Sequence, residues 1–490
     1  MEFSNQTRLK NILRLKQEKL DILVIGGGIT GCGIAWDAAT RGLKVGLIEK
    51  EDFASGTSSK SSKLIHGGMR YLETRQFKLV FEAVQERHFL RTHFPHLVKP
   101  LPFVFPIYKD TRVRFSKLWL GMWFYEIFAF FRSFKWHRAY GAKKLLQKFP
   151  NLKSKGLQGG FVFYDAFSND AWLTLEIVKL ANQQGAIVSN YVEMKSMKME
   201  NGKAIGVVCE DVFDKKPFVI ESKHIVNATG PWTDVTRKLL GEPKSQLLCG
   251  TKGTHLVVPK DKLDLKRAAI LQAKDGRFIY VIPWEEDILI GTTDEAYEGS
   301  LDEVSATRHE VDYLLQAVNT YFPDANLSDK DIVSTFSGIR PLARQSSSEG
   351  VGVYHLSREH EILKDASGVF HIYGGKLTTF RKMARDMVDQ LTKKPCQTQK
   401  LSNVTQTHFI EADLSEKSVQ EMVFHQMAQT LCDVLMRRTT VFLKTPDQGI
   451  SQVQRVAQTM AQLLGWSEAR LQLEIEAYQR QVQAAKKYLH

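Results

Sequence analysis

Short apolar runs alternate with amphipathic segments along the 490-residue chain, beginning close to its N-terminus. Residues 20–25 (LDILVI) have the length of a buried strand, residues 32–40 are helical in pattern, and residues 44–49 form the next apolar run. Three glycines separate the first strand from the helix, and Gly42 follows the helix as an end signal. The pattern predicts a βαβ unit with short connections.

The same alternation returns in the middle of the chain and near its end. Residues 253–293 are rich in strand signals, and after about residue 395 the pattern becomes helical and polar. This order predicts an α/β fold, or α+β overall, in which an antiparallel substrate sheet is inserted between nucleotide-binding segments. Besides the helix at 171–184, we expect strands at 160–164, 186–191, 206–211, 223–227, 254–258, 277–283, 287–292 and 369–373.

Two amphipathic segments allow more than one interpretation. Residues 7–19 place leucines and an isoleucine among basic residues, which suits a mobile arm or a short packed helix better than a membrane-touching helix. Residues 117–132 are the most apolar tract, but Glu126 interrupts it, and it is shorter than the ~20 residues of a spanning helix. This tract is either a buried helix or an interfacial surface, because its tryptophans and tyrosine suit headgroup depth and basic residues follow it.

Composition narrows the class of protein. Hydrophobic residues make up 43% of the chain and charged residues 25%, as in an ordinary globular protein of two or three domains. The formal charge of +13 and the pI near 9.3 indicate an anionic partner: a phosphate-bearing ligand, an acidic membrane surface or nucleic acid. The five cysteines are scattered, so neither a disulfide framework nor a zinc site is predicted, and no secretory signal is visible.

The glycines after the first strand form a Gly-x-Gly-x-x-Gly motif at residues 26–31. Such a motif alone is weak, but here it follows a predicted strand, opens a helix, and precedes Glu49 at the end of the next strand. Glycines permit the tight turn and the close approach of a pyrophosphate, and the helix N-terminus offers free N–H groups. A carboxylate at this spacing accepts ribose hydroxyls. The motif therefore predicts a dinucleotide site rather than a structural glycine turn.

Later segments favour FAD as the dinucleotide. Residues 227–230 (NATG) and 374–376 (GGK) are of the kind with which FAD enzymes return to one cofactor. A second complete Gly-x-Gly-x-x-Gly for a nicotinamide cofactor is missing from the sequence. Gly375 and Lys376, at a helix start, would aim backbone N–H groups at the flavin edge where charge builds on reduction.

The segment 58–72 (SSKSSKLIHGGMRYL) combines hydroxyls, a glycine pair, a histidine, an arginine and a tyrosine directly after the nucleotide-binding unit. Its small residues suit contact with the cofactor, because glycine lets the backbone lie close to a flat ligand. His66 can take a proton near neutral pH, and Arg70 can bind a phosphate bidentately. Cofactor chemistry and an anionic substrate are therefore expected to meet in this segment.

Further cationic positions lie far along the chain. Arg340, Arg358 and Lys376 stand beside glycine turns or cofactor segments, and a phosphate requires two or three such donors in fixed geometry. His255 alternates within a predicted strand, so it either faces the site or is a satisfied histidine of the sheet.

Five long motifs resemble FAD-dependent glycerol-3-phosphate dehydrogenase: SSKLIHGGMRYLE (61–73), NATGPW (227–232), IPWEEDILIGTTD (282–294), SGIRPL (337–342) and GGKLTTFRK (374–382). The resemblance covers about residues 20–385, and residues 433–439 are similar to the helical cap of that family. It implies a glutathione-reductase-like Rossmann FAD domain, an antiparallel β substrate domain and a C-terminal helical cap. It also implies oxidation of sn-glycerol 3-phosphate to dihydroxyacetone phosphate, with electrons passing from FAD to a membrane quinone in bacterial members.

These implied parts give the expected boundaries. An N-terminal extension at 1–19 precedes the oxidoreductase at 20–395, and the cap occupies 405–490. Within the oxidoreductase, FAD-binding segments are expected at 20–100, 155–250 and 331–395, and substrate-domain segments at 101–154 and 251–330.

The resemblance and the residue chemistry together suggest a mechanism in which the C2 hydrogen leaves as hydride while the C2 hydroxyl loses its proton. His66 is the first candidate for the base and His255 the second. Arg340 and Lys376 would stabilise the developing alkoxide, while Arg70, Tyr71 and Arg358 would hold the phosphate. The residues expected to bind FAD are Gly26, Gly27, Gly28, Gly31, Glu49, Ser58, Ser59, Ser62, Lys63, Leu64, Gly67, Gly68, Ala228, Thr229, Gly230, Gly375, Lys376, Leu377 and Thr378.

Other functions stay open at this stage. A glycerol-3-phosphate oxidase, which passes electrons to oxygen and forms peroxide, shares these motifs. Another amine- or hydroxy-acid-oxidising flavoenzyme would lack the arginine set, and a nucleic-acid-binding flavoprotein would need a binding motif that the sequence does not show. We expect a cytoplasmic protein attached peripherally to the inner face of the cell membrane, either monomeric or a homodimer, with no metal site.

Overall fold

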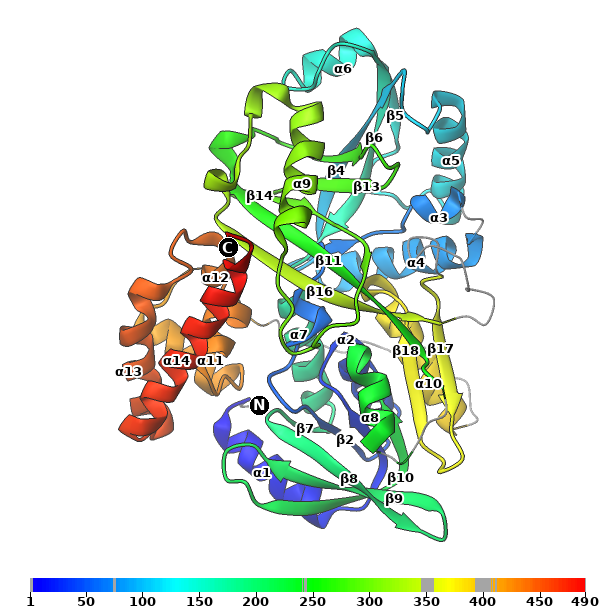
Figure 1. Ribbon diagram of the computed structural model, residues 1–490. Coiled ribbons are helices and arrows are strands. Elements are labelled where there is room, and N and C mark those ends of the chain that lie inside the picture. Colours follow the sequence, from blue (N-terminus) through cyan, green and yellow to red (C-terminus); the bar gives the residue numbers. More distant parts are fainter. Residues whose placement is uncertain are drawn as a thin grey trace.

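Two β-sheets organise the molecule (Figure 1). The structure is a computed structural model, and it describes residues 3–73, 76–239, 241, 245–344, 357–392, 407, 409 and 412–489. Within these residues the first sheet has eight strands in the order β17-β18-β10-β1-β2-β7, with β9 paired to β10 and β8 to β9. Its strands are β1 (Leu20–Ile25), β2 (Val45–Ile48), β7 (Ile187–Ser189), β8 (Val192–Glu200), β9 (Lys203–Asp211), β10 (Pro217–Asn227), β17 (His360–Lys364) and β18 (Phe370–Gly374).

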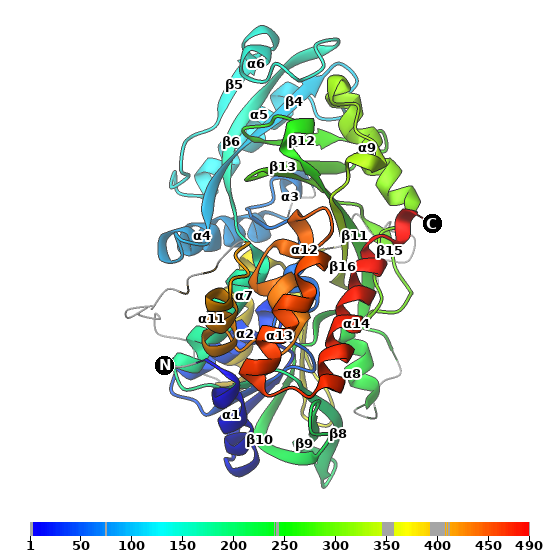
Figure 2. The ribbon, with the colours of Figure 1, turned by 90° about the vertical axis from the view of Figure 1, so that its left-hand side faces the viewer.

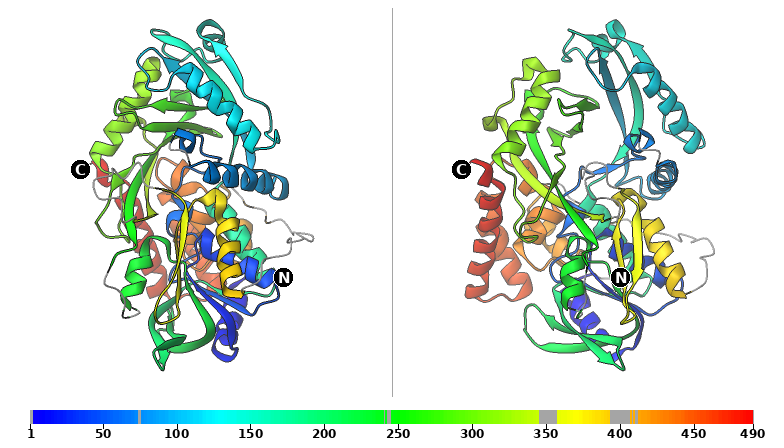
Figure 3. Two further views of the ribbon diagram at one scale, coloured as in Figure 1. Left: turned by 90° about the vertical axis from the view of Figure 1, so that its right-hand side faces the viewer. Right: turned by 45° about the vertical axis from the view of Figure 1, so that its right-hand side comes forward.

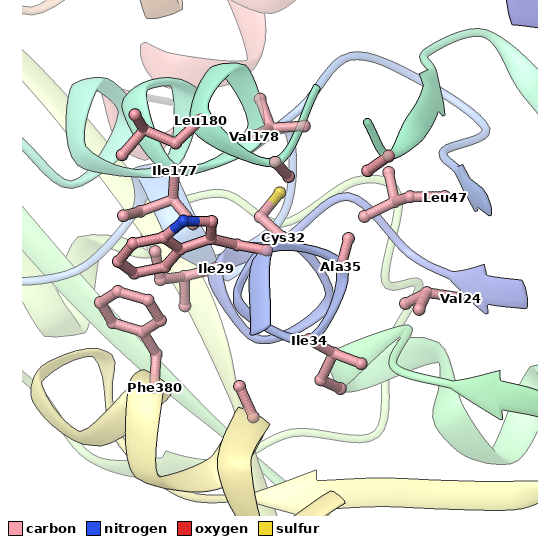
Figure 4. Close-up of a cluster of buried hydrophobic side chains, with 14 of the residues drawn as sticks. Val24, Ile29, Cys32, Ile34, Ala35, Leu47, Ile177, Val178, Leu180 and Phe380 are labelled. Atoms are coloured by element: carbon pink, nitrogen blue, oxygen red, sulfur yellow. The ribbon is translucent and has the colours of Figure 1, made fainter. Parts of the chain in front are cut away.

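The centre of this sheet is parallel, from β18 through β10, β1 and β2 to β7. Helix α2 (Ile29–Thr40) lies between α7 (Asp170–Gln183) and α10 (Phe380–Thr392) and is buried against both. Figure 4 shows the apolar side chains of α7 on one side of α2 and Phe380 of α10 on the other. Because α2 packs closely against α7 and α10, this layer holds the carboxyl ends of the parallel strands rigidly in place.

The second sheet is mainly antiparallel and has the order β15-β11-β14-β13-β12-β4-β6-β3, with β16 paired to β11 and β5 to β6. The β12–β4 pair is parallel. Its strands are β3 (Leu64–Ile65), β4 (Lys99–Tyr108), β5 (Arg138–Gly141), β6 (Leu157–Phe167), β11 (Leu248–Pro259), β12 (Ala268–Gln272), β13 (Phe278–Trp284), β14 (Asp287–Gly291), β15 (Glu295–Ala296) and β16 (Ser334–Ala343).

Alternate residues of β11 serve two different cores. Leu256 and Val258 share a cluster with the apolar side chains of α9 (Arg308–Tyr321), whereas Val257 between them belongs to the cluster that includes the C-terminal helices. The period of two along a strand places neighbours on opposite faces, so both faces of this sheet are covered.

The C-terminal helices, residues 412–489, form a bundle that we call the cap (Figure 2). They are α11 (Glu416–His425), the π-helix η8 (Asp433–Arg438), α12 (Val441–Lys444), α13 (Val453–Leu464) and α14 (Glu468–Ala485). On the opposite flank of the molecule lie α4 (Phe77–His93) and α5 (Phe115–Phe128), as both views of Figure 3 and Figure 1 show. Other helices include α1 (Asn5–Gln17), α3 (Arg70–Glu73), α6 (Ala142–Lys148), α8 (Thr233–Leu239), and the short η1 (Thr57–Ser59), η2 (Gly230–Trp232) and η7 (Leu377–Thr379).

The predicted fold class and the predicted strands and helix are confirmed, with ends shifted by a few residues. Sheet membership departs from the expected segments in three places, because β3, β6 and β16 pair within the second sheet and not with the nucleotide-binding strands. An apolar run predicts burial, whereas pairing with a strand far away in sequence decides which sheet it joins. The sequence did not predict the hairpin β8–β9 that extends the first sheet through β10.

The two ambiguous amphipathic segments are now placed. Residues 7–19 contribute to α1, which packs on the body and buries Arg8, Asn11, Ile12 and Leu15. Helix α5 is buried on one side only. Among the described residues, no helix has the length and apolarity to cross a membrane.

A buried ion pair links the segment after η1 to the start of α7 and offers a stability test. The Lys63 ammonium donates to the Asp170 carboxylate at 2.5 Å, and the side chains are 2% and 0% exposed. Substituting Asp170→Asn leaves the lysine charge without a partner, so the free energy of unfolding in urea should fall by about 3–5 kcal/mol. Glu476→Gln is the control, because its pair with Arg480 is exposed and worth about 0–1 kcal/mol. A loss for Asp170→Asn no larger than that of the control would contradict the burial of this pair.

Candidate active site

A cavity of about 370 Å³ lies between the two sheets. The carboxyl ends of β1, β2, β10 and β18 supply one side of it, which is the edge at which parallel α/β sheets bind their ligands. The second sheet supplies the other side with β11 and β16. Residues from both sheets therefore line one cavity, the feature that the sequence predicted for a site shared by cofactor and substrate.

The glycine turn between β1 and α2 has the geometry that a pyrophosphate requires. A Cβ atom at Gly31 would lie 1.9 Å from the carbonyl oxygen of Gly26, so α2 approaches β1 in a way that only glycine allows. Gly26 has φ +113° and passes so close to Ala228 that a Cβ there would meet its carbonyl oxygen at 2.6 Å. Gly28 is the N-cap of α2 and lines the cavity, which exposes the positive end of the helix to it.

Glu49 follows β2 and points into this turn. Its carboxylate accepts hydrogen bonds from the N–H groups of Gly27 at 2.6 Å and Glu51 at 2.9 Å. Burial raises the pKa of Glu49 to about 7, although these two N–H groups oppose the rise. A half-buried carboxylate beside a glycine turn is the group that holds the hydroxyls of a ribose, so the site fits the adenosine end of FAD.

Ser58 completes the phosphate-binding side. Its hydroxyl accepts a hydrogen bond from the N–H of Ile29 at 2.9 Å, which places it at the N-terminus of α2. Gly28, Ser58, Ser62 and Leu64 all line the cavity.

Four residues expected to bind the cofactor have other surroundings. The Lys63 side chain is bound to Asp170, and the Ser59 hydroxyl donates to the carbonyl of Gly56. The N–H of Gly67 donates to the Tyr125 hydroxyl at 2.9 Å, and Gly68 packs against Tyr71. None of these four is among the described residues that line the cavity. These contacts hold the segment in place beside the cavity.

The two return segments close the cavity where they were expected. Ala228, Thr229 and Gly230 follow β10, and Gly375 to Thr378 follow β18; all of them line the cavity. One detail differs from the expectation, because the Gly375 N–H donates to the carbonyl of Glu359 at 3.2 Å instead of pointing at a ligand. The glycine turn, Glu49, Ser58 and both returns together fit FAD, and they are the residues that would hold it.

Arg340 and Arg358 meet on one buried carboxylate at the second-sheet end of the cavity. Asp294 accepts from Arg340 at 3.1 Å through one oxygen and from Arg358 at 2.9 Å through the other. Arg340 also donates to the Thr292 hydroxyl at 3.0 Å. Two guanidinium groups against one carboxylate leave a net positive charge facing the cavity, as an anionic substrate requires.

The two candidate histidines stand in different environments. His66 is half-buried, and its ring meets Tyr280 edge-on at 6.1 Å. His255 is buried, stacks on Phe336 at 4.7 Å, and its Nε2 lies 2.8 Å from the Ser62 hydroxyl. Burial, with the charges of Arg340 and Lys63, lowers the pKa of His255 well below its usual value. Both rings line the cavity, but His255 is held neutral.

Lys376 and Tyr71 lie on the same wall. The Lys376 ammonium is 4.5 Å from the centre of the buried Tyr71 ring, a cation–π contact, and both residues line the cavity. The side chain of Arg70, the remaining candidate for the phosphate, lies outside the described residues.

A second cavity of about 230 Å³ adjoins the first at His66. Its walls come from α5, from β4, β6, β12 and β13, from Phe77 at the start of α4, and from the segment around α3. The side chains that line it are mostly apolar and aromatic, and they include Leu72, Phe103, Leu118, Phe124, Phe163, Phe278 and Tyr280. His66 therefore lines both cavities.

Several lining residues were not predicted. Lys60 and Trp232 line the cavity and belong to motifs that the sequence analysis describes, but only their neighbours were predicted to bind a ligand. Residues 192–194 enter from β8, a strand that the apolar pattern did not predict, and Gly338 lies on β16. A search for every residue within the flagged motifs would have found Lys60, Trp232 and Gly338, but not residues 192–194.

Comparisons with known proteins agree with this site. Residues 21–389 match the family described as FAD dependent oxidoreductase, and residues 354–471 match the C-terminal domain of alpha-glycerophosphate oxidase. The aerobic glycerol-3-phosphate dehydrogenase of Bacillus subtilis is 39% identical over 79% of this chain and 69% of its own length. The alpha-glycerophosphate oxidase of Streptococcus pyogenes serotype M1 is 35% identical over 78% of this chain and 72% of its own length.

A solved structure covers the whole length. The glycerol-3-phosphate dehydrogenase from Bacillus halodurans, complexed with FAD, has a TM-score of 0.81 and 29% identity over 99% of both chains. The family predicted from the motifs is thereby confirmed, and FAD is its cofactor. The chain belongs to the FAD dependent oxidoreductases and, among them, to the group formed by the glycerol-3-phosphate dehydrogenases and the alpha-glycerophosphate oxidases.

Proposed function

We propose that this protein oxidises sn-glycerol 3-phosphate to dihydroxyacetone phosphate and passes the electron pair to a membrane quinone. The observation that carries the first part is the pair Arg340 and Arg358 on Asp294, which faces the same cavity as the residues that fit FAD. The arginines supply hydrogen-bond donors for the phosphate and hydroxyl groups of a phosphorylated polyol. FAD, when bound, supplies the acceptor for the hydrogen and electron pair that leave C2.

The cationic residues orient the substrate. Arg358 lines the cavity and its Nη2 donates to Asp294, so the guanidinium is fixed where it can bind the substrate phosphate. Arg70 and Tyr71 are proposed to contact the same phosphate from the other wall. Arg340 and Lys376 face the C2 oxygen in this proposal and stabilise the negative charge that develops there as its proton leaves.

His66 is the better candidate for the base that takes the C2 hydroxyl proton. A base has to bind this proton, and the lowered pKa of His255 makes its protonated form unfavourable near neutral pH. His66 is half-buried and faces both cavities, so it can pass the proton on. His255 then serves as a neutral partner that holds the Ser62 hydroxyl.

The substrate assignment is tested by flavin reduction. Anaerobic addition of glycerol 3-phosphate should bleach the flavin absorbance, whereas glycerol without the phosphate should not. Arg358→Ala should raise the half-saturating substrate concentration roughly 10–100-fold, because a hydrogen bond to a charged group contributes about 1.5–3 kcal/mol. Arg344→Ala is the matched control, because Arg344 is exposed and binds Gln246. Equal bleaching by glycerol, or an unchanged requirement in Arg358→Ala, would contradict the phosphate site.

The base is tested by the pH dependence of the same step in rapid mixing. His66→Gln should slow flavin reduction by roughly 10²–10⁴-fold and remove the fall in rate at low pH, since that fall reports protonation of the base. His255→Gln should keep the fall, because His255 is already neutral there. His309→Gln, with an 81% exposed side chain, is the control. If His255→Gln loses the fall and His66→Gln keeps it, the base is His255.

The flank formed by α4, α5 and the segment up to residue 136 has the character of a membrane-binding surface. Exposed apolar side chains gather there and touch through ring contacts, such as Phe77 with Phe124 and Phe81 with Phe130. Basic side chains of the following segment, from Arg132 to Lys144, are exposed beside them. Aromatic side chains insert at headgroup depth and cations bind anionic lipid. These features support peripheral attachment to the inner face of the cell membrane. The exposed apolar residues are Phe77, Phe81, Phe115, Trp119, Leu120, Phe124, Ile127, Phe130, Phe131, Phe134 and Trp136.

The second cavity supports quinone as the acceptor. It is lined by α5, the helix that carries exposed aromatic residues, and it reaches His66. An apolar acceptor dissolved in the membrane would reach the flavin region through such a cavity without crossing water. Phe124 belongs both to the exposed surface and to the cavity wall, so the two features adjoin.

The acceptor and the surface are tested together with vesicles of anionic phospholipid. The double substitution Trp119→Ser with Ile127→Ser removes two exposed side chains and should weaken vesicle binding roughly 10–100-fold. Quinone reduction should fall with it, while reduction of a water-soluble dye stays unchanged. Leu473→Ser, on the exposed side of the cap, is the control. Peroxide formed in equal amount to oxidised substrate, without any effect of vesicles, would favour the oxidase alternative and contradict quinone.

A further inference from the structure

One buried carboxylate joins the cap to the nucleotide-binding sheet. Asp52 is fully buried and accepts from Arg437 Nε at 2.7 Å, from Arg438 Nη2 at 2.9 Å and through a second short contact from Arg438 Nη1. It also accepts from the amide of Asn190 at 3.0 Å. These partners come from the cap and from the end of β7, so three parts of the chain meet at a single side chain.

The arginines reach Asp52 because of local backbone geometry. They are neighbours in η8, a π-helix whose wide turn is closed by a hydrogen bond from Thr439 N–H to the Val434 carbonyl at 3.0 Å. In a regular α-helix, adjacent side chains point about 100° apart, whereas the wider turn helps both guanidinium groups to converge on one carboxylate. Arg437 also binds Asp433 at 2.6 Å.

The charges in this cluster balance without solvent. Two guanidinium groups face the carboxylates of Asp52 and Asp433, and the Tyr191 hydroxyl donates to Asp433 at 2.6 Å. Burial acts to raise the pKa of Asp52, but Arg438 and Arg437 outweigh it and keep that pKa below its usual value. Removal of any charged member would leave another one buried without a partner.

Asp52 stands inside the loop that is expected to hold the dinucleotide. Glu49 and Ser58, which lie on either side of it in sequence, both line the first cavity. The next residue, Phe53, packs so closely on Gly27 that a Cβ there would lie 2.8 Å from its ring, and the Ala54 N–H donates to the Gly27 carbonyl at 3.0 Å. The position of Asp52 therefore sets the position of this loop against the glycine turn.

We propose that the cap strengthens the binding of FAD. Arg437 and Arg438 act through Asp52 as positioning residues for the loop at 49–58. None of the described residues that line the first cavity comes from the cap, so its effect on FAD passes through this loop. Binding equilibria that share one structural element are reciprocal, so FAD stabilises the docked cap to the same extent that the docked cap stabilises bound FAD.

The test measures FAD affinity without substrate, so its outcome does not depend on which substrate or acceptor is used. Deflavinated protein is titrated with FAD and the dissociation constant is read from flavin fluorescence. Asp52→Asn should weaken FAD binding by at least about 30-fold. Arg438→Lys keeps the charge but loses the two-pronged guanidinium, so it should weaken binding by about 10-fold. Tyr191→Phe should weaken binding by roughly 3-fold. Arg480→Ala, which removes an exposed ion pair of α14, is the control and should bind like the unmodified protein.

A readout of the cap separates positioning from a merely structural role. In the unmodified protein, FAD should increase the hydrogen-exchange protection of residues 427–439, and this increase should disappear in Arg438→Lys. Near-ultraviolet circular dichroism selects variants that remain folded; if Asp52→Asn does not fold, Arg438→Lys and Tyr191→Phe decide the outcome. Folded variants that bind FAD within twofold of the unmodified protein, or protection of the cap that is indifferent to FAD, would overturn the proposal.

Discussion

The close approach of α2 to β1 is the constraint on which the remaining structure depends. It exists because Gly31 has no side chain, and a single Cβ atom there would overlap the carbonyl oxygen of Gly26. The approach places the N-terminus of α2 at the carboxyl edge of the parallel strands. From that edge Glu49 and Ser58 reach the turn, and α7 and α10 pack against the helix so that it cannot retreat. A dinucleotide site follows from this packing.

The second sheet turns this binding site into a candidate enzyme. It brings Arg340 of β16 to Asp294, where Arg358, just before β17 of the first sheet, also binds, and it buries His255 nearby. The segment at 58–72 belongs to both parts, because Ser58 lies against α2 while Leu64 starts a strand of the second sheet. His66 follows this strand and faces both cavities. Cofactor and substrate chemistry therefore depend on one continuous segment held at both ends.

The sequence predicted the elements better than their partners. Period, length and glycine spacing correctly predicted β1, α2 and β2, because these signals act between residues that are close in the chain. The membership of β6 in the second sheet was missed, because an apolar run looks the same in either sheet. The ion pair of Lys63 was not predicted, because its partner, Asp170, lies 107 residues away.

By itself, the sequence determined the nucleotide-binding unit, the FAD family and the excess of positive charge, since local motifs and composition carry each of them. Only the tertiary structure decided how the candidate residues combine. It showed that Asp294 holds two arginines, that burial lowers the pKa of His255, and that Asp52 meets Arg438 across 386 residues of sequence. The physical reason is that the state and direction of a polar side chain depend on desolvation and on the charges around it. These are set by strand register and helix packing, which bring together residues that no local pattern connects.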